Sequence, residues 1–229
     1  QHRLWHYKTL RNKGRIMTLP TSGLITVNDR GARAATTFGS VAAVGGNMVF
    51  IKKLTASSSA NLTFHNGVSS VVLDSTYKEY LFTFNNIHVS NDGASFYFQA
   101  NAVGGSGFNE TVTNTIFEAY HAEDDNPAAL GYNATRDAAQ GTSFLHLNCG
   151  SLDADNDSCL AGTLRIFNPS STTFVKHFIG ETNNKLDGSE TDHSFTAGYF
   201  NTTSAIDEVQ FKMNSGNIDA GDICLYGIL

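Results

Sequence analysis

The sequence predicts an all-β protein: a sandwich of two antiparallel β-sheets preceded by an extended N-terminal arm. About twelve short segments rich in β-branched and aromatic residues recur along the chain, separated by breaks rich in Gly and Asn. No long stretch shows the 3.6-residue period of an amphipathic helix. The composition agrees with this fold class, because 16 Phe and 8 Tyr occur with only 3 Pro among 229 residues.

Charge divides the chain into a basic arm, residues 1–36, and an acidic sandwich domain, residues 37–229. The arm holds seven Lys or Arg and one Asp, a net charge of +6, and the remaining chain has a net charge of −12. This contrast predicts that the arm packs on its own domain, on a neighbouring subunit or on an acidic partner. A second interpretation stays open, in which residues 1–16 are an extension that precedes a native start at Met17.

The expected strands follow one another between turn signals. Their ranges are 38–44, 47–55, 59–64, 77–88, 94–100, 113–121, 142–148, 159–168, 172–180, 194–201, 206–213 and 222–228. The best helical candidate, Asn126–Gln140, is expected instead to be a long loop with one turn, because Gly131 and Asn133 interrupt it.

Alternation of apolar and polar residues indicates which side of each strand is buried. The side chains expected to supply most of the core are Tyr80, Phe82, Phe84, Phe96, Phe98, Leu164 and Ile166. The final two segments, 206–213 and 222–228, also alternate, and the turn-forming residues 214–217 join them. They are therefore expected to lie side by side as a hairpin that closes the domain.

Several of these segments carry a family resemblance. The motifs are YKEYLFTFNNI at 77–87, GTLRIFNPS at 162–170, AGY at 197–199, the SGNI turn at 215–218 and LYGI at 225–228. Together they resemble jelly-roll, concanavalin-like domains in virion proteins of tailed bacteriophages, marine ones especially. The resemblance implies a non-enzymatic structural protein of the virion, assembled in the host cytoplasm and exposed on the extracellular particle. It would be a tail-fibre, receptor-binding or capsid-decoration component, forming a homo-oligomer such as a trimer and contacting other virion proteins.

Two other functions stay open: a free carbohydrate-binding lectin-like module and a glycan-degrading enzyme. The chain has no nucleophile elbow, Walker loop or H-E-x-x-H motif. Glu118, His121 and Glu123 cluster after one expected strand, and two carboxylates can hydrolyse glycosides. A solvated acidic loop is the favoured interpretation. Nucleic acid is not expected as a partner, because the domain has no basic patch, and no apolar window is long enough for a membrane-spanning helix.

Ligand recognition is expected in the long loops, 101–112, 122–141, 149–158 and 181–193, because loops can vary without disturbing the sheets. Their amides, carboxylates and occasional aromatic rings suit sugar hydroxyls and ring faces, so a cell-surface glycan is the expected ligand. The candidate binding residues are Tyr132, Asn133, Asp153 and Asp155.

The same 149–158 loop offers a candidate metal site. Asp153, Asp155 and Asp157 stand at alternate positions, a spacing that can surround Ca²⁺ with oxygen ligands. The rest of the EF-hand pattern is missing, so a plain acidic loop is favoured over a calcium site. Cys149 and Cys159 flank the loop and are expected to be free thiols, with a disulfide as the alternative.

Overall fold

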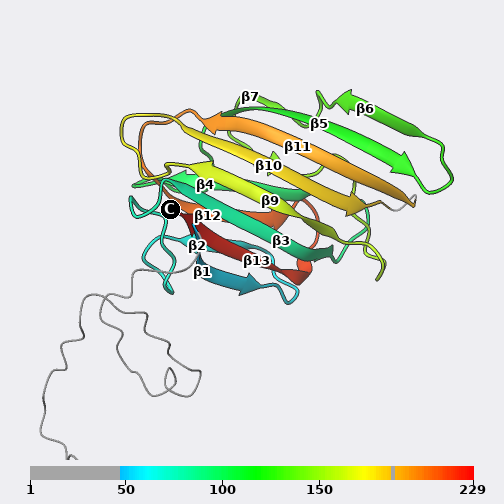
Figure 1. Cartoon of the computed structure of the whole chain (residues 1–229), viewed down its shortest axis with the longest axis horizontal. Helices are drawn as coiled ribbons and strands as arrows, with labels where there is room; N and C mark the ends of the chain where they lie inside the picture. Colours follow the sequence, from blue (N-terminus) through cyan, green and yellow to red (C-terminus); the bar gives the residue numbers. More distant parts are fainter. Residues whose placement is uncertain (1–46, 187–188) are drawn as a thin grey trace, which may run out of the picture. The chain divides into compact units, whose positions relative to one another are not determined.

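The computed structural model describes residues 47–186 and 189–229, which fold into two antiparallel β-sheets packed face to face (Figure 1). The predicted fold class is therefore confirmed. The strands are β1 (Met48–Thr55), β2 (Leu62–His65), β3 (Glu79–Val89), β4 (Phe96–Ala102), β5 (Val112–Ala122), β6 (Ala128–Tyr132), β7 (Ala138–Gly141), β8 (Leu145–His146), β9 (Leu160–Phe167), β10 (Lys176–Lys185), β11 (Glu190–Phe200), β12 (Ile206–Met213) and β13 (Ile218–Ile228). The predicted arm, residues 1–36, and the strand predicted at 38–44 lie outside the described residues.

The two sheets differ in size. The larger has nine strands in the order β1-β13-β3-β9-β10-β11-β5-β6, with β7 also paired to β5, and the smaller has the order β2-β12-β4-β8. Every pairing is antiparallel. In the part of the chain that the structure describes, no helix is long and apolar enough to cross a membrane.

The core lies between the sheets and is rich in phenylalanine. Phe82 and Phe84 on β3 are buried and point toward the smaller sheet, where they meet Phe64 and Phe96, with ring centroids 5.2 Å apart in both pairs. Both pairs have the edge-to-face geometry that aromatic rings prefer. All seven side chains that the alternation assigned to the core are buried.

The expected hairpin of the last two strands is wrong. β12 lies in the four-stranded sheet between β2 and β4, whereas β13 lies in the nine-stranded sheet between β1 and β3. Residues 214–217 cross from one sheet to the other. The backbone N–H of Asn214 donates a hydrogen bond to the carbonyl of Ser95, and the carbonyl of Asn217 accepts one from the N–H of Ser90. Alternation could not reveal this, because each strand buries its apolar face whether the two share a sheet or face each other across the core.

Two segments expected to be loops are strands. The 181–193 segment belongs to a long hairpin, since β10 and β11 pair from Lys176 opposite Phe200 to Lys185 opposite Thr191. The 122–141 segment contains β6 and β7, which pair with β5 and leave only the 133–137 turn between them. Both segments are rich in polar residues or Ala and contain no Val or Ile, the apolar β-branched residues that mark most strands.

The inner face of the nine-stranded sheet becomes polar toward β5. Its buried polar side chains there are Asn114, Thr182, Asn184, Asp192, Ser194 and Thr196. The segment 147–150 satisfies part of this surface: Thr182 donates a hydrogen bond to the carbonyl of Leu147, and the N–H of Cys149 donates to Ser194 Oγ. Buried polar groups need such partners, so this segment belongs to the fold of the domain.

Candidate functional site

A row of aromatic rings crosses the outer face of three neighbouring strands, β6, β5 and β11. Tyr132 stands opposite Phe117, and Phe117 stands opposite Phe195. The rings of Phe117 and Phe195 stack at 5.0 Å with an interplanar angle of 12°. Phe117 is 41% exposed and Tyr132 is 56% exposed. This aromatic row, defined by these three residues, forms an exposed apolar strip (the strands lie at the upper right of Figure 1).

Polar groups flank the aromatic row at both ends. The imidazole of His193 lies 4.3 Å from the Phe195 ring and contacts Glu181 Oε1 through Nε2 at 2.8 Å. At the other end, the Tyr132 hydroxyl donates a hydrogen bond of 2.5 Å to Asp137. This hydrogen bond is the main reason that the pKa of Tyr132 is raised. Hydrogen-bonding groups beside exposed rings are what a sugar ligand requires.

Of the two loop residues predicted to bind ligand near this position, Asn133 faces away from the aromatic row. Its amide nitrogen donates to Glu118 Oε1 at 3.1 Å, and its side-chain oxygen accepts from the backbone and hydroxyl of Thr135. The amide therefore holds the turn after β6, and Tyr132 is the residue that lies at the outer surface.

The other predicted residues lie in a different part of the domain. Asp153 is buried, and its carboxylate accepts a hydrogen bond from the N–H of Asp155 at 3.4 Å. Asp157 is paired with Lys185 at 3.3 Å. The 151–158 loop packs against residues 90–94 through the backbone of Leu152, away from the aromatic row. The four ligand-binding candidates therefore lie on two separate surfaces of the domain.

Calcium binding by Asp153, Asp155 and Asp157 stays a prediction. Among residues 47–186 and 189–229, no three His, Cys, Asp or Glu side chains are grouped so as to hold a metal ion. Cys149, Cys159 and Cys224 are free thiols, as the sequence analysis favoured for the first two.

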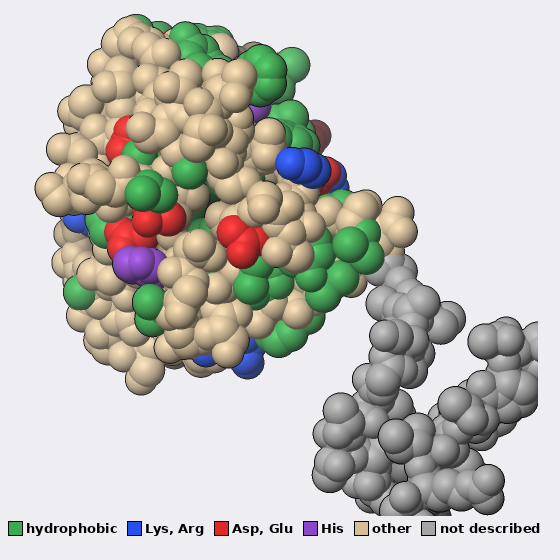
Figure 2. Space-filling view, turned by 90° about the vertical axis from the view of Figure 1, so that its left-hand side faces the viewer, with side chains coloured by type: hydrophobic (Ala, Val, Ile, Leu, Met, Phe, Trp, Pro, Cys, Tyr) green, Lys and Arg blue, Asp and Glu red, His purple; other side chains and the backbone are tan. Residues whose placement is uncertain are grey.

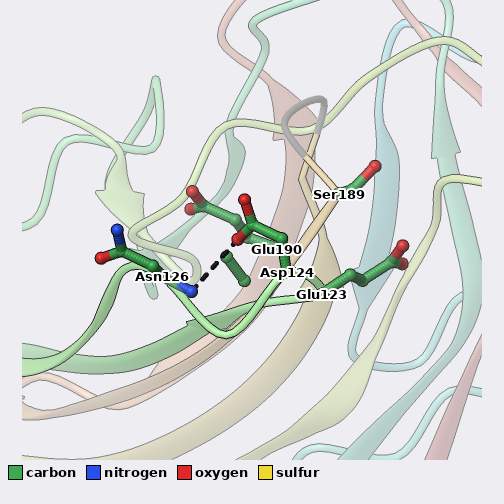
Figure 3. Close-up of a pocket in the computed structure, with 6 residues that line it drawn as sticks. Glu123, Asp124, Asn126, Ser189 and Glu190 are labelled. Carbon is green, nitrogen blue, oxygen red and sulfur yellow. Dashed lines mark hydrogen bonds between the residues drawn. The ribbon is translucent and has the colours of Figure 1, made fainter.

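An acidic hollow of about 370 Å³ lies where β5 ends and β11 begins (Figure 3). The carboxylates of Asp124 and Glu190 point to the same side of it, and Glu123 points away; the N–H of Asn126 donates to Asp124 at 3.1 Å. Glu118 does not line this hollow. It stands five residues before Glu123, about 17 Å along an extended strand, so the two glutamates considered for glycoside hydrolysis do not share a site.

Glu118 lies instead beside a buried acid that sequence reasoning missed. Asp192 accepts a hydrogen bond from Ser194 Oγ at 2.6 Å, and burial raises its pKa to about 6. The nearby carboxyl of Glu118 contributes to this increase in the pKa of Asp192 through hydrogen bonding and charge repulsion. Asp192 is only 1% exposed and offers no surface to a substrate, whereas Glu118 beside it is half-buried.

A second exposed apolar surface surrounds the edge strand β1. Met48 is 52% exposed, Phe50 57% and Leu229 67%, and Phe50 packs edge-on against Tyr226 at 5.6 Å. Hydrophobic side chains gather at the right of the view in Figure 2, where the described chain begins. An apolar edge strand of this kind is typical of a surface that contacts more polypeptide. We call the exposed side chains Met48, Phe50 and Leu229 the β1 patch.

Comparison with protein-family models, curated proteins and solved structures found no match to this chain.

Proposed function

We propose that this chain is a non-enzymatic recognition protein of a tailed-phage virion and that it binds a cell-surface glycan through the aromatic row. The observation that carries the proposal is the in-register line of Tyr132, Phe117 and Phe195 on an open sheet face. Exposed aromatic rings flanked by hydrogen-bonding groups suit a sugar ligand, which offers both apolar C–H groups and hydroxyls. The virion origin and the jelly-roll family rest on the sequence resemblance alone.

A ligand that covers the aromatic row would remove apolar ring surface from water, which is energetically favourable. Large apolar rings are costly to leave in water, and stacking contributes roughly 0.5–1.5 kcal/mol per aromatic pair beyond the area buried. The polar groups at the ends, His193 with Glu181 and Tyr132 with Asp137, can exchange hydrogen bonds with sugar hydroxyls. A binding strip of this chemistry selects the shape of a glycan and performs no bond cleavage.

Binding should be measured on an array of bacterial surface polysaccharides, followed by titration of the best polysaccharide. We expect Phe117→Ala and Tyr132→Ala each to weaken binding about three- to tenfold. Tyr199→Ala is the matched control, because Tyr199 lies on β11 on the same outer face, four residues from Phe195. The proposal fails if no polysaccharide binds, or if the control weakens binding as much as the row variants.

A second candidate function is a purely structural role in the virion, such as capsid decoration, in which the chain assembles with copies of itself. The β1 patch favours it, because exposed apolar side chains on an edge strand can be covered by another subunit. Light scattering should then give a mass above that of a monomer. Phe50→Lys should lower this mass while glycan binding persists, which separates assembly from recognition.

A further inference from the structure

A cleft of about 370 Å³ lies between the 133–137 turn and the edge of the four-stranded sheet. It is bordered by the start of β7 on one side and by β8 with β4 on the other. Among its lining residues are Tyr97, Arg136, Asp137, Phe144 and His146. None of the three rings of the aromatic row lines it, but the cleft adjoins the Tyr132 end of the row, because its lining residue Asp137 accepts the hydrogen bond of the Tyr132 hydroxyl.

The floor of the cleft is a tightly connected polar and aromatic unit. The rings of Tyr97 and His146 lie 4.5 Å apart, with the tyrosine hydroxyl 3.1 Å from Nε2 of the imidazole. Arg136 Nη1 donates to Ser95 Oγ and to the carbonyl of Asn148, both at 3.1 Å. These contacts fix the guanidinium in place, so it is pre-organised for a ligand.

Two cationic side chains, Arg136 and Lys212, lie in or beside the cleft of a domain that is acidic overall. Past residue 36 the chain has eight Lys or Arg against twenty Asp or Glu, and acidic side chains (red) appear at several places in Figure 2. Within the described residues, Arg136 and Lys212 have no carboxylate within 4.0 Å, which is also true of Lys52, Lys78 and Lys176, whereas Lys53, Arg165 and Lys185 are paired.

Lys212 adds a second cation beside the cleft, next to two of its lining residues, Tyr97 and Phe144. It stands opposite Tyr97 in the pairing of β12 with β4, and its Nζ lies 5.0 Å from the centroid of the Phe144 ring. Burial, followed by the charge of Arg136, lowers the pKa of His146 to about 4, so the imidazole is neutral at pH 7. Asp137, a carboxylate in the lining, already accepts the Tyr132 hydroxyl.

We propose that this cleft binds an anionic substituent of a sugar, a carboxylate or a sulfate. Arg136 and Lys212 supply the positive charge, the Tyr97 hydroxyl a hydrogen bond, and the Phe144 ring an apolar wall for the sugar. Planar guanidinium groups recognise such oxyanions strongly. This inference names acidic glycans as the ligand class of the proposed function. It depends on the proposed function only for the assumption that the anionic sugar belongs to a cell-surface glycan.

The test uses the full chain and three small probes at low ionic strength: sodium glucuronate, glucose 6-sulfate and neutral glucose. We expect at least one anionic sugar to bind about tenfold more tightly than glucose. The probe that binds tells whether the group is a carboxylate or a sulfate. Equal affinity for all three, or no binding of either anion, overturns the proposal.

Variants assign the binding to the cleft. Lys212→Ala should weaken the anionic sugar about three- to tenfold and Lys212→Arg should restore it, whereas Lys78→Ala removes an exposed charge elsewhere and should change nothing. Tyr97→Phe, which keeps the ring, should weaken binding about two- to fivefold. Unchanged affinity in both Lys212→Ala and Tyr97→Phe excludes the cleft. Phe117→Ala should leave glucuronate binding intact, so the aromatic row and the cleft can fail separately.

Discussion

Replacing Asp192 with Asn should stabilise the protein at neutral pH and flatten the dependence of its stability on pH. Asp192 is buried on β11, and burial is the largest reason that its pKa is raised from 3.8 to about 6. The carboxyl of Glu118 adds to this increase, whereas hydrogen bonds from Ser194 and from the N–H of Gly150 oppose it. The folded protein therefore holds this negative charge at a cost above pH 6.

The direction follows from proton linkage. Between pH 3.8 and about 6 the folded state binds a proton at Asp192 that the unfolded state has released. The contribution of Asp192 to the free energy of unfolding is therefore highest below pH 3.8. It falls as the pH rises from 3.8 to about 6 and is constant above that range. A pKa difference of about two corresponds to at most about 3 kcal/mol.

Asparagine tests this reasoning because it keeps the shape of aspartate and can still accept the hydrogen bond from Ser194. We expect Asp192→Asn to raise the free energy of unfolding by about 1–3 kcal/mol at pH 7 and by little at pH 3.5. Urea unfolding followed by circular dichroism at several pH values measures both. The control is Asp157→Asn, an exposed residue beside Lys185, which should change stability by less than about 1 kcal/mol. The reasoning is refuted if Asp192→Asn is less stable than the parent protein at pH 7. It is also refuted if the stability of the parent, relative to that of Asp192→Asn, rises between pH 4 and 6.

The remaining predictions concern the core, the acidic loop and the arm. Phe211→Ala should cost about 3–5 kcal/mol in thermal or urea unfolding, because this fully buried ring contacts four other phenylalanines, whereas Phe174→Ala at a 69% exposed position should cost little. Adding Ca²⁺ should leave the melting temperature unchanged if the 151–158 loop is a plain acidic loop; a rise that is abolished by replacing its aspartates would establish the calcium site instead. Deleting residues 1–36 should lower the number of subunits per assembly measured by light scattering, because the arm and the domain carry opposite net charges that would attract the arm to a neighbouring subunit; an unchanged number of subunits would exclude this contact.

Much of the core could be predicted from the sequence because its buried strand faces are apolar. Tyr80, Phe82 and Phe84 occupy alternate positions, and a period of two places them on one side of β3 whatever its neighbours are. Leu164 and Ile166 follow the same rule on β9. In these strands local alternation alone determines the direction of the side chains.

Strand pairing could not be predicted in the same way. β12 and β13 follow each other closely in the chain and both alternate, yet they lie in opposite sheets. Their partners, β4 for one and β3 for the other, stand more than a hundred residues earlier, and nothing local encodes that separation. The short connection at 214–217 has the composition of a hairpin turn and serves as an arch between sheets.

Tyr132 of the aromatic row was among the sequence candidates, but its partners Phe117 and Phe195 were missed for a further reason, which also bears on function. On β11 the usual order is inverted: Asp192 and Ser194 point into the domain, while His193 and Phe195 point outward. Alternation in the sequence is equally consistent with the aromatic face being the core, so it cannot indicate which side is exposed. The inverted face requires the 147–150 segment to satisfy the inner polar groups, and it leaves aromatic rings in water outside. A strand with polar side chains inside and aromatic rings outside lowers the stability of the domain. A ligand or partner that covers the aromatic row would offset this loss, which supports a binding role for the row.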